Sequence, residues 1–415
     1  MRTITETGEA ALIAKRVLAK LTTAQKNEIL NKAAQALRAN AAKIIAANAK
    51  DIENAKANGI KPSLIDRLRL DESRIDGMAD GLEQVAKLPD PIGEVIDMKT
   101  LPNGLTVGKK RVPMGVIGII YEARPNVTSD AFGLCLKAGS ACILRGGKEA
   151  ILSNITTISV FRSVIEEMGF NPDIVQLIED TSRESATAMM KMNGYIDVLI
   201  PRGGAGLIQS VVQNSTVPVI ETGVGNCHVF VDYNAKINDA VNIIVNAKAQ
   251  RPSVCNAAET LLVHKDIAEE FLPKAAKALK EKNVELRCDE KSAEYVGECT
   301  PATDEDYATE FLDYILAVKV VENIDEAIEH IAKYSTGHSE AIVSEDYTNC
   351  QRFLNEVDSA AVYVNASTRF TDGNEFGFGA EIGISTQKLH ARGPMGLKEL
   401  TTTKYLIYGN GQIRG

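Results

Sequence analysis

The run Val116-Ile117-Gly118-Ile119-Ile120-Tyr121 begins a regular alternation of strand and helix patterns. Its nearly continuous apolar character predicts a short strand that is covered on both faces. Further strands are predicted at residues 142–145, 174–178, 196–200 and 217–220, with helices between them. Alternation of this kind is typical of an open, mostly parallel sheet with helices on both sides, so the predicted fold class is α/β.

The segment before this block has a different pattern. Thr22 and Gln25 have the spacing of a helix capping box, and helical periodicity continues from there to residue 88. Residues 99–111 are polar and contain the turn Pro102-Asn103-Gly104. They predict a hairpin that leaves the helical part of the chain as an arm.

A second alternation of strands and helices starts near Val229 and predicts a second α/β domain. The last strand pattern, at residues 404–408, follows a Gly-rich loop and has no local partner. A strand of this kind often pairs with a projecting arm or with another subunit. We therefore expect the tail to do one or the other.

The composition is that of a soluble protein, with 415 residues, 45% of them hydrophobic and 24% charged. At roughly 100 to 200 residues per domain, this length predicts two or three domains. The net charge of −9 and the lack of a basic block argue against nucleic-acid binding. The polar stretch 1–9 and the absence of an apolar run of roughly 18 residues predict a cytoplasmic protein with no membrane segment.

The seven cysteines include no C-x-x-C pair, so we expect neither a disulfide framework nor a metal site. Cys255 stands apart from the others because it lies in Arg251-Pro252-Ser253-Val254-Cys255-Asn256, a predicted loop between a helix and a strand. Loops held by rigid elements often carry catalytic groups, and Arg251 could stabilise a thiolate there. An ordinary loop cysteine is the alternative interpretation.

Two polar side chains follow strands of the first predicted sheet. Asn126 comes soon after the strand 116–121, and Glu221 directly follows the strand 217–220. In parallel sheets the carboxyl ends of the strands border the ligand crevice. An amide there can donate to an oxyanion, and a carboxylate can act as a general base. Taken singly, each could equally be a turn residue.

Asn126, Glu221 and Cys255 together resemble the catalytic residues of the aldehyde dehydrogenase superfamily in order and in spacing, the last two being 34 positions apart (255 − 221). The resemblance implies that Cys255 is the nucleophile, that the Asn126 amide and the Cys255 N–H form the oxyanion hole, and that Glu221 lies nearby. It also implies an aldehyde-dehydrogenase-like fold with a Rossmann-type NADP-binding domain (1–95 and 116–223), an α/β catalytic domain (224–385), and a β-strand oligomerisation arm and tail (96–115 and 386–415).

A nucleotide site is expected although neither G-x-G-x-x-G nor the phosphate-loop motif occurs in the chain. The Gly-rich candidate is Arg202-Gly203-Gly204-Ala205-Gly206, between a predicted strand and helix. Gly203 and Gly204 would let the backbone approach a pyrophosphate at the helix N-terminus. A plain tight turn is the alternative, although the position matches the phosphate-contacting turn of the superfamily.

The resemblance also bears on the choice of cofactor. Arg145 and Lys148 stand where NAD users of the superfamily often have a lysine and, three residues later, a glutamate for the ribose hydroxyls. A cation in place of that acid favours a 2′-phosphate, which implies NADP(H). A solvated charged turn is the alternative. Glu310 matches the position that holds the nicotinamide ribose.

Within the superfamily, several stretches resemble the gamma-glutamyl phosphate reductases, namely residues 121–128, 321–331, 335–342, 365–373 and 385–396. This narrower resemblance implies L-glutamyl 5-phosphate as substrate and L-glutamate 5-semialdehyde as product, in the second step of proline biosynthesis. Cys255 would form a thioester as phosphate leaves, and NADPH would reduce it. His338 is expected to be a hydrogen-bonding loop residue and not the base.

Several polar residues are candidates for binding this substrate. Arg369, Thr371 and Asp372 form a polar loop that suits the α-carboxylate and α-ammonium groups of glutamate. Arg124 or Arg251 could hold the leaving phosphate. Hydrolysis of the thioester would waste the substrate, so Glu221 could relay protons or hold the Cys255 loop.

Two other functions stay open at this point. One is an NAD(P)-dependent semialdehyde dehydrogenase that uses water, which phosphate dependence would distinguish. The other is a non-catalytic scaffold that binds its pathway kinase through the arm and tail, which a fully functional Cys255→Ser variant would favour. In either case the arm and tail suggest a homo-oligomer formed by strand exchange, and a contact with glutamate 5-kinase stays open.

Overall fold

The computed structural model describes residues 2–60 and 62–414, and the chain forms two compact units. Unit 1 consists of Met1–Thr222, Gly377–Gly383 and Met395–Gly415, and unit 2 of Gly223–Phe376 and Ile384–Pro394. The expected domain bounds differ from these units near the C-terminus. Residues 377–383, expected in the catalytic domain, pack in unit 1, and residues 386–394, expected in the tail, pack in unit 2. Met395 holds segment 377–383 in place, because its N–H donates to the Gly383 carbonyl and its carbonyl accepts from the Ile382 N–H.

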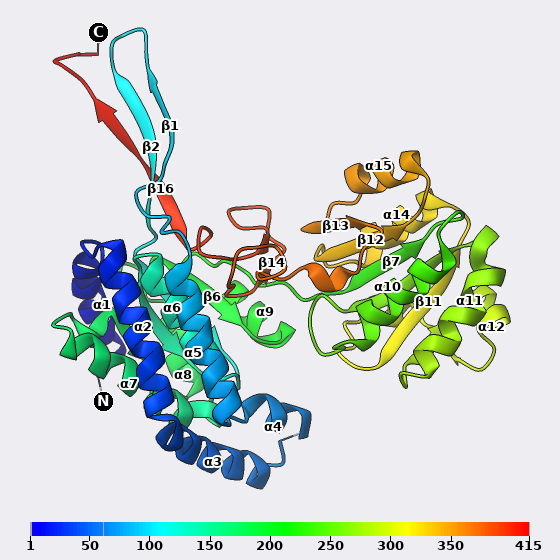
Figure 1. The fold of residues 1–415 in the computed structure, drawn as a ribbon, viewed down its shortest axis with the longest axis horizontal. Helices are drawn as coiled ribbons and strands as arrows, with labels where there is room; N and C mark the ends of the chain where they lie inside the picture. Colours follow the sequence, from blue (N-terminus) through cyan, green and yellow to red (C-terminus); the bar gives the residue numbers. More distant parts are fainter. Residues whose placement is uncertain (1, 61, 415) are drawn as a thin grey trace. The chain divides into compact units, whose positions relative to one another are not determined.

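The parallel sheet of unit 1 is built around the first predicted strand (Figure 1). Its strand order is β5-β4-β3-β6, and Val219 adds a single parallel bridge to Leu199 on β6. Counted along the chain this is the 3-2-1-4-5 order of a Rossmann sheet, whose ligand crevice lies where the order reverses, between β3 and β6. The bounds are β3 Val116–Tyr121, β4 Ala141–Arg145, β5 Val175–Leu177 and β6 Val198–Arg202.

Helices cover both faces of this sheet. Helices α6 and α7 lie on one face, with α2 and α5 packed outside them, and α1, α8 and α9 lie on the other. No helix among the described residues is both long enough and apolar enough to span a membrane. The bounds are α1 Ile4–Leu18, α2 Thr23–Ala39, α3 Ala41–Ala57, α4 Pro62–Leu68, α5 Glu72–Lys87, α6 Asn126–Lys137, α7 Ile151–Glu167, α8 Arg183–Met190 and α9 Ala205–Asn214.

The predicted capping box is confirmed, because Thr22 and Gln25 cap the first turn of α2 reciprocally. The helical stretch expected up to residue 88 is instead interrupted between α4 and α5. Asp71 accepts a hydrogen bond from the Arg74 N–H and starts α5 as a new helix. A side-chain cap competes here with continuation of the helix.

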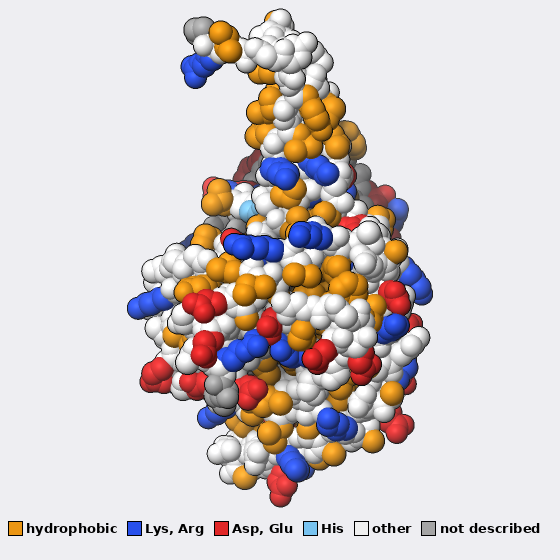
Figure 2. Space-filling view, turned by 90° about the vertical axis from the view of Figure 1, so that its left-hand side faces the viewer, with side chains coloured by type: hydrophobic (Ala, Val, Ile, Leu, Met, Phe, Trp, Pro, Cys, Tyr) orange, Lys and Arg blue, Asp and Glu red, His pale blue; other side chains and the backbone are white. Residues whose placement is uncertain are grey.

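The tail strand pairs with the arm, which was one of its two expected partners. Strands β1 (Val95–Thr100), β2 (Thr106–Pro113) and β16 (Thr401–Tyr408) form an antiparallel sheet with β2 in the middle. Hydrophobic side chains remain exposed along the arm (Figure 2). They include Val95, Ile96 and Met98 on β1 and Tyr405, Ile407 and Tyr408 on β16.

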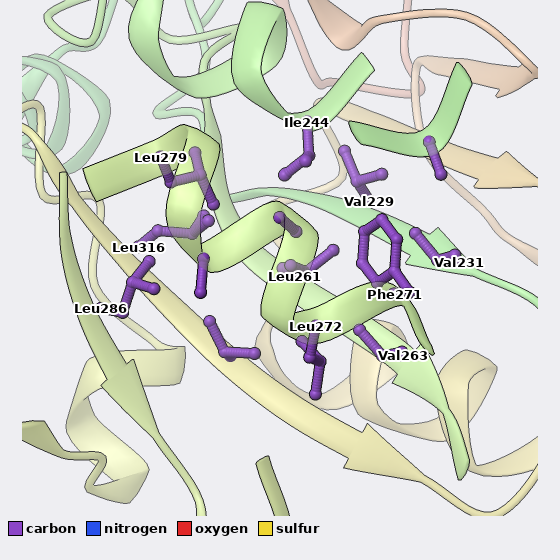
Figure 3. Packing of buried hydrophobic residues seen from close by; sticks show 14 of the residues in the cluster. Val229, Val231, Ile244, Leu261, Val263, Phe271, Leu272, Leu279, Leu286 and Leu316 are labelled. Carbon is purple, nitrogen blue, oxygen red and sulfur yellow. The ribbon is translucent and has the colours of Figure 1, made fainter. Parts of the chain in front are cut away.

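Unit 2 has a parallel sheet with strand order β10-β9-β11-β8-β7-β12-β13. Alternate side chains of its central strands point to opposite faces. Val229 and Leu261 pack with α10, α11 and α12, as Figure 3 shows for part of this core, whereas Phe230 and Leu262 pack with α14 and α15. The bounds are β7 Cys227–Val231, β8 Ala258–His264, β9 Glu285–Cys288, β10 Thr300–Pro301, β11 Ile315–Val321, β12 Ser339–Val343, β13 Ala361–Val364, α10 Ile237–Ala249, α11 Lys265–Lys280, α12 Glu290–Val296, α14 Ile324–Tyr334 and α15 Tyr347–Glu356.

A fully buried ion pair links α10 to β8 in this unit. Lys248 Nζ lies 2.5 Å from Glu259 Oε2, and both side chains are inaccessible to solvent. Burial raises the pKa of the Glu259 carboxyl, and the neighbouring ammonium opposes that effect. The other carboxylate oxygen accepts a hydrogen bond from the Leu312 N–H at 3.3 Å. The pair therefore supports the chain segment that contains Glu310.

We predict that Lys248→Met lowers the melting temperature strongly, because removing one partner of a buried pair costs roughly 3–5 kcal/mol. The loss of stability caused by this substitution should be larger at pH 9 than at pH 6. A carboxyl whose pKa is raised in the folded state favours folding at low pH, and this contribution is lost as the pH rises through the folded-state pKa.

Thermal melts of the variant at both pH values would measure this effect. Lys274→Met is the matched control, because Lys274 pairs with Glu270 on the exposed surface of α11. It should change the free energy of unfolding by less than about 1 kcal/mol. Equal losses in the two variants would contradict the prediction.

Candidate functional site

The expected site residues of unit 1 follow the carboxyl ends of its parallel strands. Because parallel strands end at the same edge of a sheet, these residues share one border. Arg124 and Asn126 follow β3, Arg145 ends β4 and Lys148 follows it, Gly203 and Gly204 follow β6, and Glu221 follows the bridge at Val219.

Asn126 is the first residue of α6, and its side chain is fixed by a residue one turn later. Its Nδ2 donates to Asp130 Oδ2 at 3.1 Å. Burial raises the pKa of the Asp130 carboxyl to about 6, and the Asn126 hydrogen bond and the Arg202 cation oppose this rise. Asp130 was not among the predicted site residues, although its i, i+4 spacing to Asn126 is a signal for such a contact.

The Gly-rich turn after β6 is partly occupied by a carboxylate of the chain itself. Gly204 precedes α9, and its N–H donates to Glu122 Oε2 at 3.1 Å. A Cβ at Gly203 would lie 2.7 Å from the Glu122 Cδ atom, so a glycine at this position leaves room for that carboxylate. An incoming pyrophosphate could reach the Gly204 N–H only if the exposed Glu122 side chain turned away.

Arg145 and Lys148 differ in their surroundings. The Arg145 Nη2 donates to the carbonyl oxygens of Thr181 and Ser182 at 2.7 and 2.8 Å, which ties it to the loop after β5. Its Nε is buried without a hydrogen-bond partner in the described part of the chain, and burial lowers the pKa of the guanidinium. Lys148 is exposed. Arg145 at the end of β4 and Lys148 just after it thus place two cations where the sequence predicts a 2′-phosphate.

The remaining candidates of unit 1 are half-buried. Glu221 precedes Thr222, whose Oγ1 donates to the Pro201 carbonyl at 2.7 Å and so fastens this segment to the end of β6. Arg124 is held at its backbone, where its N–H donates to the Glu122 carbonyl at 2.7 Å.

In unit 2, Cys255 lies half-buried in the loop between α10 and β8. Gly225 packs directly behind it, because a Cβ at that position would lie 1.5 Å from the Cys255 carbonyl oxygen. The Cys227 thiol donates to the same oxygen at 3.1 Å. His338 is buried, and its Nδ1 lies 2.7 Å from Ser339 Oγ. The segment at the start of β7 therefore fixes the backbone of Cys255.

Asn256 fixes the other side of the loop and was missed by sequence analysis. Its Nδ2 donates to the carbonyls of Arg369 and Thr371 at 3.2 and 2.9 Å, and its Oδ1 accepts from Arg369 Nη1. Its own carbonyl accepts from Thr368 Oγ1 at 2.7 Å. Its place next to Cys255 is the one sequence signal that could have singled it out.

The segment that Asn256 holds carries the expected substrate-binding residues. Burial lowers the pKa of the Arg369 guanidinium, as does the nearby Arg251, whereas Asp372 and Cys255 raise it. The Thr371 side chain is fully buried, and its hydroxyl lies 2.7 Å from both Ser339 Oγ and the Tyr363 hydroxyl. Burial favours a supporting role for Thr371. Arg369 and Asp372 are half-buried.

Glu310 lies beside the glycine that packs against Cys255. Its Oε1 accepts a hydrogen bond from the Gly225 N–H at 2.8 Å, and burial raises the pKa of its carboxyl. Unit 2 thus brings Cys255, Arg251, Arg369, Asp372 and Glu310 into one neighbourhood. The connections that bring them together run through Gly225 and Asn256.

Two segments of the chain, residues 2–315 and 301–406, match the model of the aldehyde dehydrogenase family. A gamma-glutamyl phosphate reductase of Lachnospira eligens is 61% identical over 414 residues, covering 100% of both chains. One of Clostridium botulinum is 64% identical over 407 residues, covering 98% of each. The crystal structure of a gamma-glutamyl phosphate reductase from Thermotoga maritima matches with a TM-score of 0.97 and 51% identity, covering 99% of each chain.

Both the family match and the identities extend over nearly the whole chain, and they agree with the strand order and loop positions described above. The chain therefore belongs to the aldehyde dehydrogenase family and, within it, to the gamma-glutamyl phosphate reductases.

Proposed function

We propose that this chain reduces L-glutamyl 5-phosphate to L-glutamate 5-semialdehyde and releases phosphate, with NADPH as reductant, as the second step of proline biosynthesis. The relatives named gamma-glutamyl phosphate reductase support the substrate. The observation that carries the chemistry is the half-buried Cys255, held on both sides and lying beside the cations Arg251 and Arg369.

The first step transfers the acyl group to the protein. The Cys255 thiolate attacks the acyl carbon, so that an S–C bond forms and the carbonyl becomes an oxyanion. The Asn126 amide and the Cys255 N–H donate to this oxyanion. The C–O bond to phosphate then breaks, which leaves a thioester on Cys255 and free phosphate. Arg124 or Arg251 balances the charge of the leaving group.

The second step reduces this thioester. Reduced nicotinamide bound to the protein would supply the hydride. Arg145 and Lys148 would hold the 2′-phosphate side, Gly203 and Gly204 the pyrophosphate, and Glu310 the nicotinamide ribose. The resulting thiohemiacetal collapses to the aldehyde and returns the thiolate to Cys255.

The remaining residues act on the substrate and on protons. Arg369 and Asp372 would bind the α-carboxylate and α-ammonium groups, with Thr371 beneath them. Glu221 would relay protons or hold the Cys255 loop. We also propose that the protein is cytoplasmic and forms a homo-oligomer through the arm, and that the arm and tail could contact glutamate 5-kinase.

The reverse reaction tests the proposed chemistry, because the acyl phosphate is too unstable to supply easily. With glutamate semialdehyde and NADP, we expect NADPH formation that requires inorganic phosphate and falls at least about 10³-fold in Cys255→Ser. Absorbance of NADPH measures the rate. Cys350→Ser, which changes a buried cysteine of α15, is the matched control and should stay active.

Phosphate-independent NADPH formation would contradict the proposal, because water would then resolve the thioester. Activity retained in Cys255→Ser would exclude the covalent route altogether.

A second prediction concerns Asp130. As a carboxylate it only accepts hydrogen bonds, so it keeps the NH₂ group of Asn126 turned toward itself and fixes the orientation of the amide. Its pKa of about 6 predicts that kcat falls as the pH drops through 6. In Asp130→Asn we expect kcat to be about tenfold lower, because the amide loses its fixed orientation. The acid limb of the pH profile should also disappear.

Steady-state profiles of the reverse reaction between pH 5 and 8 would measure both effects. Asp80→Asn, on the exposed face of α5, is the control and should keep the wild-type profile. If the acid limb persists in Asp130→Asn, it belongs to another group.

A third prediction concerns the arm. Replacing Tyr405 and Ile407 with aspartate places charge on its exposed apolar surface and should reduce the molar mass measured by light scattering. Lys404→Asp changes charge on the same strand without removing apolar area, and should leave the mass unchanged. An unchanged mass in the double variant would mean that this surface of the arm is not an interface.

A further inference from the structure

The Asn256 side chain, next to the proposed nucleophile, forms three hydrogen bonds. It is only 4% exposed, and its amide both donates and accepts. The two hydrogen bonds that it donates hold the backbone of the Arg369–Thr371 segment, and the one that it accepts holds the Arg369 side chain. Because Asn256 directly follows Cys255, these contacts join the nucleophile to that segment.

The Arg369 guanidinium is held by neutral partners. Its Nε donates to Gln250 Oε1 at 2.9 Å, and its Nη1 donates to Asn256 Oδ1. Within residues 2–60 and 62–414, no carboxylate forms a salt bridge with it. Asp372 is near enough to interact electrostatically, but its Oδ1 accepts from the Asn374 and Glu375 N–H groups of its own turn.

An amide oxygen accepts a hydrogen bond without adding charge, whereas a carboxylate at the same place would cancel the guanidinium. A positive charge that stays uncancelled near a thiol favours the thiolate. The other charged or titratable groups that face this region are Arg251, Asp372, Cys227, His338, Glu310 and Tyr363.

We propose that Asn256 is a positioning residue that holds the uncancelled positive charge of Arg369 beside Cys255 and thereby favours the reactive thiolate. The proposal rests on the proposed role of Cys255 and goes beyond it, because it assigns the reactivity of that thiol to a pair of residues. Arg369 then has a function in addition to binding the α-carboxylate.

Alkylation of Cys255 by iodoacetamide tests this directly, because only the thiolate reacts. Mass spectrometry of the Cys255 peptide between pH 6 and 10 gives the midpoint of the alkylation rate in the full-length protein. We expect Asn256→Ala and Arg369→Ala each to raise this midpoint by about one pH unit. Since the two residues act through one charge, the double variant should shift no further than Arg369→Ala alone.

Asn256→Asp provides a second test in case Asn256→Ala folds poorly. Aspartate can still accept the Arg369 hydrogen bond but cancels its charge, so the midpoint should also rise. Asn355→Asp, an exposed residue of α15 in the same unit, is the control and should keep the wild-type midpoint. The kcat of the reverse reaction should fall about tenfold in all three Asn256 and Arg369 single variants, with an unchanged KM for NADP.

Additive shifts in the double variant, or a wild-type midpoint in Asn256→Asp, would overturn the proposal. The first result would mean that Asn256 acts on the loop without Arg369, and the second that charge near Cys255 does not matter. These outcomes are separate from failure of the proposed function. Phosphate-independent turnover would reject that function, while the alkylation midpoints would still decide whether Asn256 acts through Arg369.

Discussion

The close contact between Gly225 and the Cys255 carbonyl is the constraint on which the thiol-bearing unit depends. A Cβ at position 225 would overlap that oxygen, so no other residue allows the start of β7 to lie against the loop. The N–H of the same glycine holds the Glu310 carboxylate. One residue without a side chain thus fixes both the Cys255 loop and the Glu310 carboxylate that we expect at the ribose. The buried Lys248–Glu259 pair also supports the segment that carries Glu310, through the Leu312 N–H.

The regular elements were largely predictable because their signals are local. Apolar runs such as 116–121 predicted the strands of the first sheet, and the Thr22–Gln25 spacing predicted the start of α2. The short elements β9, β10 and α12 were not predicted. Strand β10 spans only Thr300–Pro301, which is too short for a periodic pattern, and pairing with a neighbouring strand defines it.

The candidate site was predictable only where a residue carries its own signal. Cys255, Asn126 and Glu221 stood out by type, order and spacing. Their supporting residues did not, because the contacts join positions far apart in the chain. The hydrogen bonds from Asn256 reach 113 and 115 positions along the sequence, and the one between Glu122 and Gly204 spans 82. No periodicity or local motif encodes contacts of this length.

The anion site of unit 1 is already occupied by a carboxylate of the chain, whereas the cation of unit 2 is held by neutral groups. Each arrangement fits the ligand that we propose for it. In unit 1 the Gly204 N–H already binds the exposed Glu122 carboxylate, so an incoming phosphate must replace one anion with another. When no cofactor is bound, the Gly204 N–H keeps its hydrogen bond to Glu122. The cost of breaking that bond lowers the net affinity for the phosphate. In unit 2 the Arg369 guanidinium donates to two neutral side chains, Gln250 and Asn256, neither of which cancels its charge. A cofactor that leaves after every turnover suits the first arrangement, and the nucleophilic role that we propose for Cys255 suits the second.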